Sequence, residues 1–292
     1  MTDYWGIRIA ALVAIACVVL TGCGDGPAAT PTPNQTLPST GSTTTSPPPS
    51  SPSSFPRPTS RPGESHETNL LPIVQHGPRD KKRIALTFDA DLTALMRQRL
   101  QHGKVKSYYN EALINELRAM KVPATLFLTG MWMEQYPDRT RELAADPLFE
   151  LGTHTYDHRG FTKHCYTLGT VPVADMLADV RRAVDLLDKL DPHPTRWFRF
   201  PGGCYDGTAL HELAPSGVTA VGLDVPGADG FAKSPKPIIK QVLSNVRAGS
   251  IVVLHLHGGD NAPFTDEAIP EIVRTLRARG YTLVTVTQLM SD

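Results

Sequence analysis

The chain has 292 residues, of which 29 are basic and 29 acidic, so its formal net charge is zero. This balance excludes the strongly basic class of nucleic-acid-binding proteins, and no nucleic acid is expected as a partner. The apolar fraction of 40% is enough to build a substantial hydrophobic core.

The first 22 residues have the organisation of an export signal. One cation, Arg8, precedes the apolar stretch Ile9–Leu20, which is shorter than the roughly 20 residues needed to span a bilayer. This stretch leads into Leu20-Thr21-Gly22-Cys23, which resembles the bacterial lipobox. The resemblance implies a signal peptide over residues 1–22, lipidation of Cys23 and anchoring on the outer face of the cytoplasmic membrane. The alternative is an ordinary secretory signal with an incidental cysteine.

Residues 23–80 are predicted to form a tether. From Gly24 to about Glu67 the sequence is rich in Pro, Ser and Thr and has almost no large apolar residues. Such a segment cannot bury enough surface to offset the entropy lost on ordering. The folded domain is therefore expected over residues 81–292.

The rest of the chain alternates short apolar segments with helical patterns. The strand candidates are Ile84–Phe88, Thr125–Thr129, Phe149–Thr153, Trp197–Phe200, Thr219–Leu223, Ile251–Leu254 and Thr282–Val286. The helix candidates are Asn110–Met120, Arg139–Ala145, Val173–Leu190, Ala209–Ala214, Pro237–Arg247 and Asp266–Arg279. This alternation predicts an α/β fold with a parallel sheet. We expect a distorted or incomplete (β/α) barrel, with an open doubly wound sheet as the alternative.

Polar side chains follow five of the predicted strands. They are Asp89 and Asp91, His154 and His158, Arg199, Asp224, and His255. Each one alone is better explained as a helix cap, a turn residue or a surface ion pair. Together they predict a site at the carboxyl ends of the strands, which is where α/β barrels hold their active sites.

These residue types suit metal-assisted hydrolysis. In a helix or a tight turn, the spacing of His154 and His158 lets both imidazoles reach one ion. One Asp and two His with an open position form a catalytic zinc arrangement. A second carboxylate can take the proton of an attacking water, and a separate histidine can protonate a leaving amine.

The same residues resemble the motifs of the polysaccharide deacetylase family, also called the NodB homology domain or carbohydrate esterase family 4. The motifs, in the family's order, are Thr87-Phe88-Asp89, His154-x-x-x-His158, Arg199-x-Pro201, Asp224 and Leu254-His255. The resemblance implies a distorted (β/α) barrel that removes N- or O-acetyl groups from peptidoglycan, chitin or xylan. It also implies one divalent metal, with zinc expected first and cobalt or another divalent ion second.

For the base and the metal, the resemblance implies Asp89 as general base, Arg199 as its partner and the two histidines as ligands. The family usually has a second Asp directly after the first, as the third ligand, where this chain has Ala90. We assign the third-ligand role to Asp91, one residue further on. The alternative is a weakened or absent metal.

For the acid, the resemblance implies His255 tuned by Asp224, with His257 as a second candidate. The oxyanion would be bound by the metal and by the backbone N–H of Gly202. Gly202 stands where the family commonly has an aromatic residue, and Val253 replaces the usual acyl-pocket Leu. These departures leave the chemistry in place and the sugar undefined.

Two cysteines, Cys165 and Cys204, lie in the predicted domain, where they form either a disulfide or two buried thiols. The function expected is removal of acetyl groups, N-acetyl first, from cell-wall glycan by a membrane-anchored monomer. The alternatives are a glycan-binding lipoprotein without catalysis and a deacetylase of chitin-like or xylan substrates.

Overall fold

The computed structural model describes residues 69–291. The predicted signal peptide, Cys23 and most of the predicted tether lie outside these residues. Among the residues that are described, no helix combines the length and the apolar character needed to cross a membrane.

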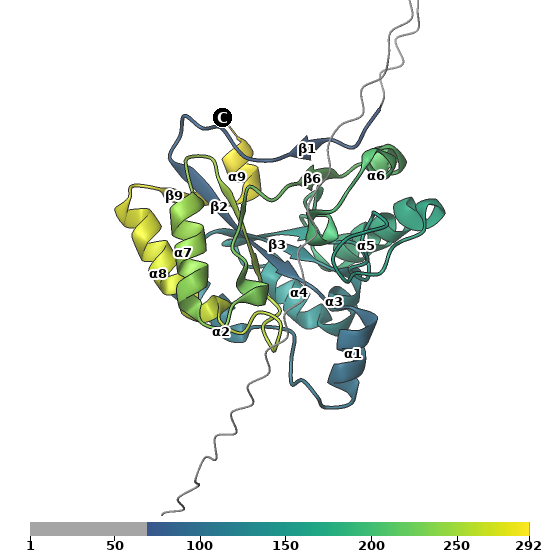
Figure 1. Cartoon of the computed structure of the whole chain (residues 1–292), viewed down its shortest axis with the longest axis horizontal. Coiled ribbons are helices and arrows are strands. Elements are labelled where there is room, and N and C mark those ends of the chain that lie inside the picture. Colours follow the sequence, from purple (N-terminus) through teal and green to yellow (C-terminus); the bar gives the residue numbers. More distant parts are fainter. Residues whose placement is uncertain (1–68, 292) are drawn as a thin grey trace, which may run out of the picture. The chain divides into compact units, whose positions relative to one another are not determined.

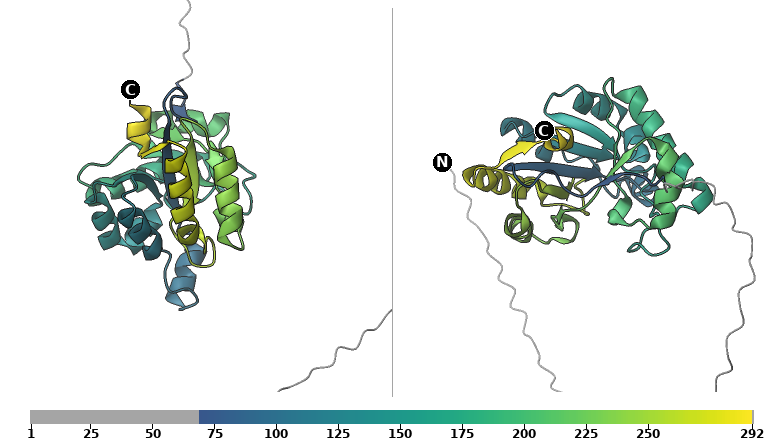
Figure 2. Two further views of the ribbon diagram at one scale, coloured as in Figure 1. Left: turned by 90° about the vertical axis from the view of Figure 1, so that its left-hand side faces the viewer. Right: turned by 90° about the horizontal axis from the view of Figure 1, so that it is seen from above.

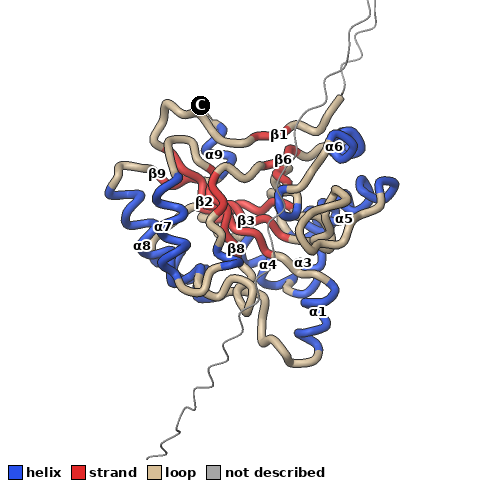
Figure 3. Tube along the Cα trace, viewed as in Figure 1, coloured by secondary structure: helices blue, strands red, loops and turns tan. Residues whose placement is uncertain are grey.

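A parallel sheet occupies the centre of the described chain, with helices around it (Figures 1 and 3). Its strands are β1 (Ile73–Val74), β2 (Arg83–Ala90), β3 (Ala124–Leu128), β4 (Phe149–Thr153), β5 (Trp197–Phe198), β6 (Thr219–Val221), β7 (Val225–Pro226), β8 (Ile251–His255) and β9 (Thr282–Val284). The order is β1-β6-β5-β4-β3-β2-β8-β7, and β9 also pairs with β2. Within residues 69–291 no ladder joins β1 to β7, so the sheet forms a curled half-barrel. The incomplete barrel predicted from the sequence is confirmed.

Helices connect the strands, and several of them pack against the outer face of the sheet. The helices are α1 (Ala94–Gln101), α2 (Glu111–Ala119), α3 (Gly130–Gln135), α4 (Pro137–Ala144), α5 (Met176–Leu190), α6 (Gly207–Leu213), α7 (Pro235–Asn245), α8 (Thr265–Ala278) and α9 (Val286–Met290). The last helix lies against the opposite face, where Val286 and Leu289 contact Ala85 and Phe127. Helices α7 and α8 lie side by side, as the left view of Figure 2 shows. Four short 3₁₀ turns, η1 to η4, complete the connections at Val173–Asp175, Pro201–Gly203, Ala214–Ser216 and Asp229–Phe231.

The side-chain alternation of β2 sets the two faces of the sheet. Ile84, Leu86, Phe88 and Ala90 are buried in the large apolar cluster formed with the helices. The residues between them point to the opposite face, because successive side chains of a strand alternate. The strand therefore carries Asp89 into the interior of the half-barrel.

The folded domain begins earlier than the predicted residue 81. Strand β1 pairs with β6, and Leu71 is buried in the cluster around Phe198 and Phe200. Two short strands were too brief to show a sequence pattern: β1 and β7 have two residues each. The predicted strand over 282–286 also ends early, because Thr285 forms a capping box with Gln288 and starts α9.

Candidate active site

The structure brings six of the seven predicted strand-end residues together and leaves Asp224 outside. The gathered residues are Asp89, Asp91, His154, His158, Arg199 and His255. They come from the carboxyl ends of β2, β4, β5 and β8, which are neighbours in the sheet apart from the intervening β3. The predicted location at one rim is therefore correct.

Asp91 reaches the site although Ala90 separates it from Asp89 in the sequence. On an extended strand, residues two apart share a face, so Asp89 and Asp91 both point inward while Ala90 packs outward. The backbone on both sides of Asp91 is tied to Thr129, whose hydroxyl donates to the carbonyl of Ala90 (3.2 Å) and accepts from the N–H of Leu92 (3.0 Å). The displaced carboxylate thus occupies a fixed position.

The two histidines lie in a tight turn after β4, and not on a helix. Thr155 and His158 both have positive φ, 65° and 63°, and the hydroxyl of Thr155 accepts a hydrogen bond from the His158 N–H. These backbone conformations are costly for residues other than glycine, and such strain is concentrated at functional sites. Asp179 of α5 stabilises the turn by accepting the N–H of Tyr156 at 2.9 Å.

The Asp and His atoms have the spacing of ligands around one ion. Oδ1 of Asp91 lies 3.5 Å from Nε2 of His154 and 3.5 Å from Nε2 of His158. Tetrahedral bonds of about 2.0–2.2 Å place neighbouring ligand atoms roughly 3.3–3.6 Å apart. This Oδ1 is buried and has no hydrogen-bond partner among the described residues. The three side chains therefore fit a divalent metal.

The hydrogen bonding of His154 and the pKa shifts of His158 and Asp91 also suit metal binding. Nδ1 of His154 lies 2.8 Å from the carbonyl of Arg199, which only accepts, so Nδ1 carries a proton and Nε2 is the nitrogen that can face a metal. Burial lowers the pKa of His158 to about 4, which leaves this imidazole neutral. Burial alone would raise the pKa of Asp91, but the nearby His158 and His257 hold it well below its ordinary value.

A second cluster shares Asp91 but involves His255 and His257. Burial tends to lower the pKa of His255, yet the carboxylate of Asp229 outweighs it and raises this pKa to about 10. A protonated imidazole has no lone pair for a metal. Asp91 with His154 and His158 therefore fits a metal better than the second cluster does.

Asp89 is held in a fixed orientation by Arg199. Its Oδ1 accepts a 2.6 Å hydrogen bond from Nη1 of Arg199, which also contacts the hydroxyl of Thr87 at 2.9 Å. Arg199 is fully buried and its guanidinium lies 4.0 Å from the centre of the Phe127 ring. Oδ2 of Asp89 lies 3.7 Å from Nε2 of His154, beside the ligand set.

The partner of His255 is Asp229, so the predicted role of Asp224 is wrong. Asp229 lies 2.8 Å from Nδ1 of His255 and accepts both the backbone N–H of His255, at 2.8 Å, and the hydroxyl of Thr265, at 2.7 Å. Asp224 instead forms an ion pair with Arg79 at 2.7 Å. Asp224 lies directly before β7, whereas η4, which contacts β8, brings Asp229 to His255.

His257 is a site residue that the sequence analysis named only as an alternative acid. Its Nε2 lies 3.1 Å from Oδ2 of Asp91, and only 2% of the residue is exposed. The signal in the sequence was its period-two spacing from His255, which matches the spacing of Asp91 from Asp89. The burial of His257 argues against contact with substrate, whereas 29% of the His255 side chain is exposed.

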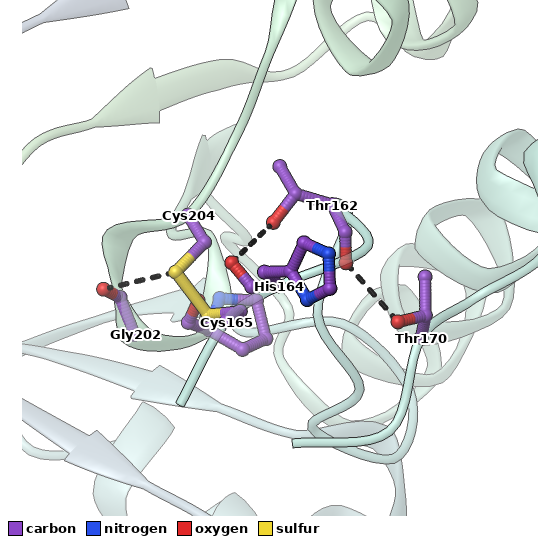
Figure 4. Close-up of a disulfide and its surroundings, with 7 residues drawn as sticks. Thr162, His164, Cys165, Thr170, Gly202 and Cys204 are labelled. Carbon is purple, nitrogen blue, oxygen red and sulfur yellow. Dashed lines mark hydrogen bonds between the residues drawn. A yellow bond between two sulfur atoms is a disulfide. The ribbon is translucent and has the colours of Figure 1, made fainter. Parts of the chain in front are cut away.

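The loop that follows Arg199 is fixed by a disulfide between Cys165 and Cys204 (Figure 4). Of the two alternatives for these cysteines, the disulfide is confirmed. Gly202 lies beside it with φ of 58°, and a Cβ there would meet the ring of Tyr166 at 2.9 Å. Gly202 is exposed and Val253 is buried; the oxyanion role of the one and the acyl-pocket role of the other stay predictions.

Two exposed aromatic rings border this site. Tyr166, 78% exposed, lies against Gly202, and Phe231, 80% exposed, follows Asp229 in η4. Aromatic rings gain free energy when apolar surface covers them, and an exposed pair beside polar groups is typical of a binding surface. The site therefore combines two carboxylate–cation pairs, three side chains that fit a metal, and two exposed aromatic rings nearby.

Comparisons with known proteins agree with this arrangement. The sequence profile of a family described as polysaccharide deacetylase matches residues 76–221. The chain is similar to the peptidoglycan-N-acetylmuramic acid deacetylase PdaC of Bacillus subtilis, with 26% identity over 77% of this chain and 42% of that protein. It spans about half the length of the curated relatives it matches, 54% of another one from the same organism.

Solved structures share the fold. The Bc1960 peptidoglycan N-acetylglucosamine deacetylase is similar with a TM-score of 0.64 and 23% identity, over 75% of this chain and 93% of that one. BA3943, a CE4 family pseudoenzyme from Bacillus anthracis, is similar with a TM-score of 0.60 and 19% identity, over 75% and 69%. At these identities the structures support the fold alone.

Proposed function

Since the chain belongs to the polysaccharide deacetylase family, we propose that it hydrolyses acetyl groups, N-acetyl first, from an extracytoplasmic polysaccharide, with peptidoglycan the leading substrate. The observation that carries the proposal is the pairing of two differently charged groups on adjacent strands. Asp89 of β2 is opposite His255 of β8 in the ladder, and each has its own buried partner, Arg199 and Asp229. A base and an acid side by side are what amide hydrolysis requires.

The residues divide the reaction between them. A divalent metal held by Asp91, His154 and His158, zinc in our proposal, would polarise the acetyl carbonyl and acidify a water molecule. Asp89 takes the proton of the attacking water while Arg199 keeps its carboxylate oriented. His255, protonated through its pair with Asp229, delivers a proton to the leaving nitrogen. The N–H of Gly202 is proposed to bind the developing negative charge on the oxygen.

The substrate class is supported by the aromatic border and by the relatives. Tyr166 and Phe231 provide exposed rings on which a sugar ring can stack. PdaC and Bc1960 are peptidoglycan deacetylases by name. Chitin-like oligomers and acetylxylan are the alternative substrates.

A glycan-binding protein without catalysis is the second candidate. One observation favours it: Ala90 replaces the carboxylate that directly follows Asp89 in the family motif, and a pseudoenzyme with this fold exists. The intact pairs of Asp89 with Arg199 and His255 with Asp229 favour catalysis, because a binding protein has no use for them.

The test is acetate release by the full chain, loaded with zinc in detergent, from peptidoglycan, chitin oligomers and acetylxylan. We expect release from peptidoglycan and a loss of about a hundredfold or more in Asp89→Asn. Arg181→Gln, on the outer helix α5, is the matched control and should keep wild-type rates. Binding of glycan without acetate release in saturating zinc or cobalt would instead support the second candidate.

We further propose that the protein is a lipoprotein on the outer face of the membrane, anchored at Cys23. The lipobox-like sequence supports this, as does the disulfide, which is typical of proteins outside the cytosol. Fatty-acid labelling should disappear in Cys23→Ala and remain in Cys17→Ala. Labelling that survives in Cys23→Ala rules out the anchor.

A further inference from the structure

The displaced aspartate and His257 form a second cross-strand pair beside the catalytic one. In the parallel ladder of β2 and β8, Asp89 is opposite His255, and the N–H of Leu256 donates to the carbonyl of Asp89 at 2.8 Å. Two residues further along each chain come Asp91 and His257, on the same face as the first pair. Asp-x-Asp at the end of β2 is thus matched by His-x-His at the end of β8, with Asp91 and His257 just beyond the two strands.

The two oxygens of Asp91 face different groups. Oδ1 points at Nε2 of His154 and of His158, both 3.5 Å away. Oδ2 lies 3.1 Å from Nε2 of His257. A carboxylate oxygen only accepts, so the His257 tautomer that carries its proton on Nε2 can donate to Oδ2, and its Nδ1, 3.2 Å from the carbonyl of Gly258, is then not a donor. The carboxylate therefore has a contact on Oδ2 and no hydrogen-bond partner on Oδ1 among the described residues.

We propose that His257 is a positioning residue that holds Asp91 for the metal, and that it compensates for the shift of this aspartate by one residue. The inference rests on the metal-binding role in the proposed function. His257 contacts Oδ2 of Asp91 and the two ligand histidines contact Oδ1, so we place its action on the metal through Asp91. A neighbour that orients a ligand in this way typically contributes 10- to 100-fold, roughly, to metal affinity.

The experiment measures metal affinity, not turnover. Zinc dissociation constants of the full chain would be determined by competition with a chromogenic chelator. We expect His257→Leu to weaken zinc binding by about 10- to 100-fold, and His257→Gln, whose amide can still donate to Oδ2, to recover part of this loss. His211→Ala is the control, since this exposed histidine of α6 lies outside the site and should leave the affinity unchanged.

The absorption spectrum of the cobalt-loaded protein separates positioning from direct ligation. A positioning residue leaves the number and type of ligands unchanged, so the saturated His257→Gln variant should keep the wild-type spectrum. A change in that spectrum, or an unchanged zinc affinity in both His257 variants, would overturn the proposal. Circular dichroism of the metal-free variants checks folding, and His257→Gln keeps the test valid if His257→Leu does not fold. If the protein binds zinc but releases no acetate, the proposed function fails and this inference stands.

Discussion

At the scale of single residues, the site depends on which carboxylate each cation meets. Arg199 meets Asp89 inside the half-barrel, and His255 meets Asp229, which is fully buried. Burying either charge without its partner would be costly, because a lone charge in the interior loses its hydration. The pairs therefore orient the two groups to which we assign the proton transfers.

The contact of Asp229, and not Asp224, with His255 leads to a prediction about activity. Asp229→Asn removes the charge that keeps His255 protonated, so kcat should fall by about 100-fold or more. Asp224→Asn removes only the ion pair with Arg79 and should keep activity within a few-fold. Steady-state kinetics at neutral pH measure both, and equal losses in the two variants would contradict the assignment of Asp229.

The pH dependence of stability tests the same pair. The pKa of His255 is raised from 6.5 to about 10 in the folded protein, so its contribution is complete below about pH 6.5 and is lost as pH rises through about 10. In the metal-free protein, the difference in free energy of unfolding between wild type and His255→Gln should shrink between pH 7 and pH 10.5. The expected decrease is roughly 1–3 kcal/mol, because solvent screens the partly exposed ring. A constant difference in denaturant titrations would show that the pKa is not raised.

At the scale of elements, the junction of β3 with α3 decides where Asp91 lies. Thr129 follows β3 directly and caps α3 by accepting the N–H of Trp132 at 3.3 Å. The same hydroxyl contacts the backbone on either side of Asp91. The Thr129 side chain therefore links the N-terminus of α3 to the backbone that positions the Asp91 carboxylate.

Removal of this hydroxyl should affect stability and metal binding together. Thr129→Val keeps the shape of the side chain but leaves buried backbone groups unpaired, which should lower the free energy of unfolding by about 1–3 kcal/mol. Zinc affinity should fall in the same variant, because Asp91 becomes less constrained. Thr129→Ser retains the hydroxyl and should restore most of both quantities. Denaturant unfolding and chelator competition give the two readings, and an unchanged zinc affinity in Thr129→Val would refute the link.

At the scale of the whole molecule, the first described residues extend the sheet of the half-barrel. Strand β1 pairs with β6 at the edge of the sheet, and Arg79 contacts Asp224 and the carbonyl of Ala248. These contacts join the start of the domain to the loops before β7 and β8. Residues 69–80 are thus part of the fold, although their composition gives little sign of it.

A truncation series tests this conclusion. A chain that begins at residue 69 should unfold at nearly the temperature of the full chain. One that begins at residue 81 loses β1, the buried Leu71 and the Arg79 ion pair, and should be destabilised by roughly 3 kcal/mol or more. Thermal melts of the metal-free proteins compare the two, and equal melting temperatures would show that the segment is dispensable.

The fold and most of the site followed from local patterns. The strand over 149–153 has the bounds predicted for it, and the alternation of apolar segments and helices implied a parallel sheet. Because parallel strands deliver their carboxyl ends to one edge, the residues after β2, β4, β5 and β8 could be expected to meet. The roles of Gly202 and Val253 followed only from the family resemblance, and they remain predictions.

The sequence by itself determined the class of fold, the rim that holds the site and the residue types available there, because those depend on periodicity along the chain. The tertiary structure decided the pairings: Asp229 and not Asp224 with His255, Cys165 with Cys204, and Asp91 with His257. Asp224 and Asp229 lie five residues apart, and no local sequence pattern shows which of them pairs with a histidine. That choice depends on how the segment around β7 and η4 packs against β8, which is a contact between segments distant in the chain.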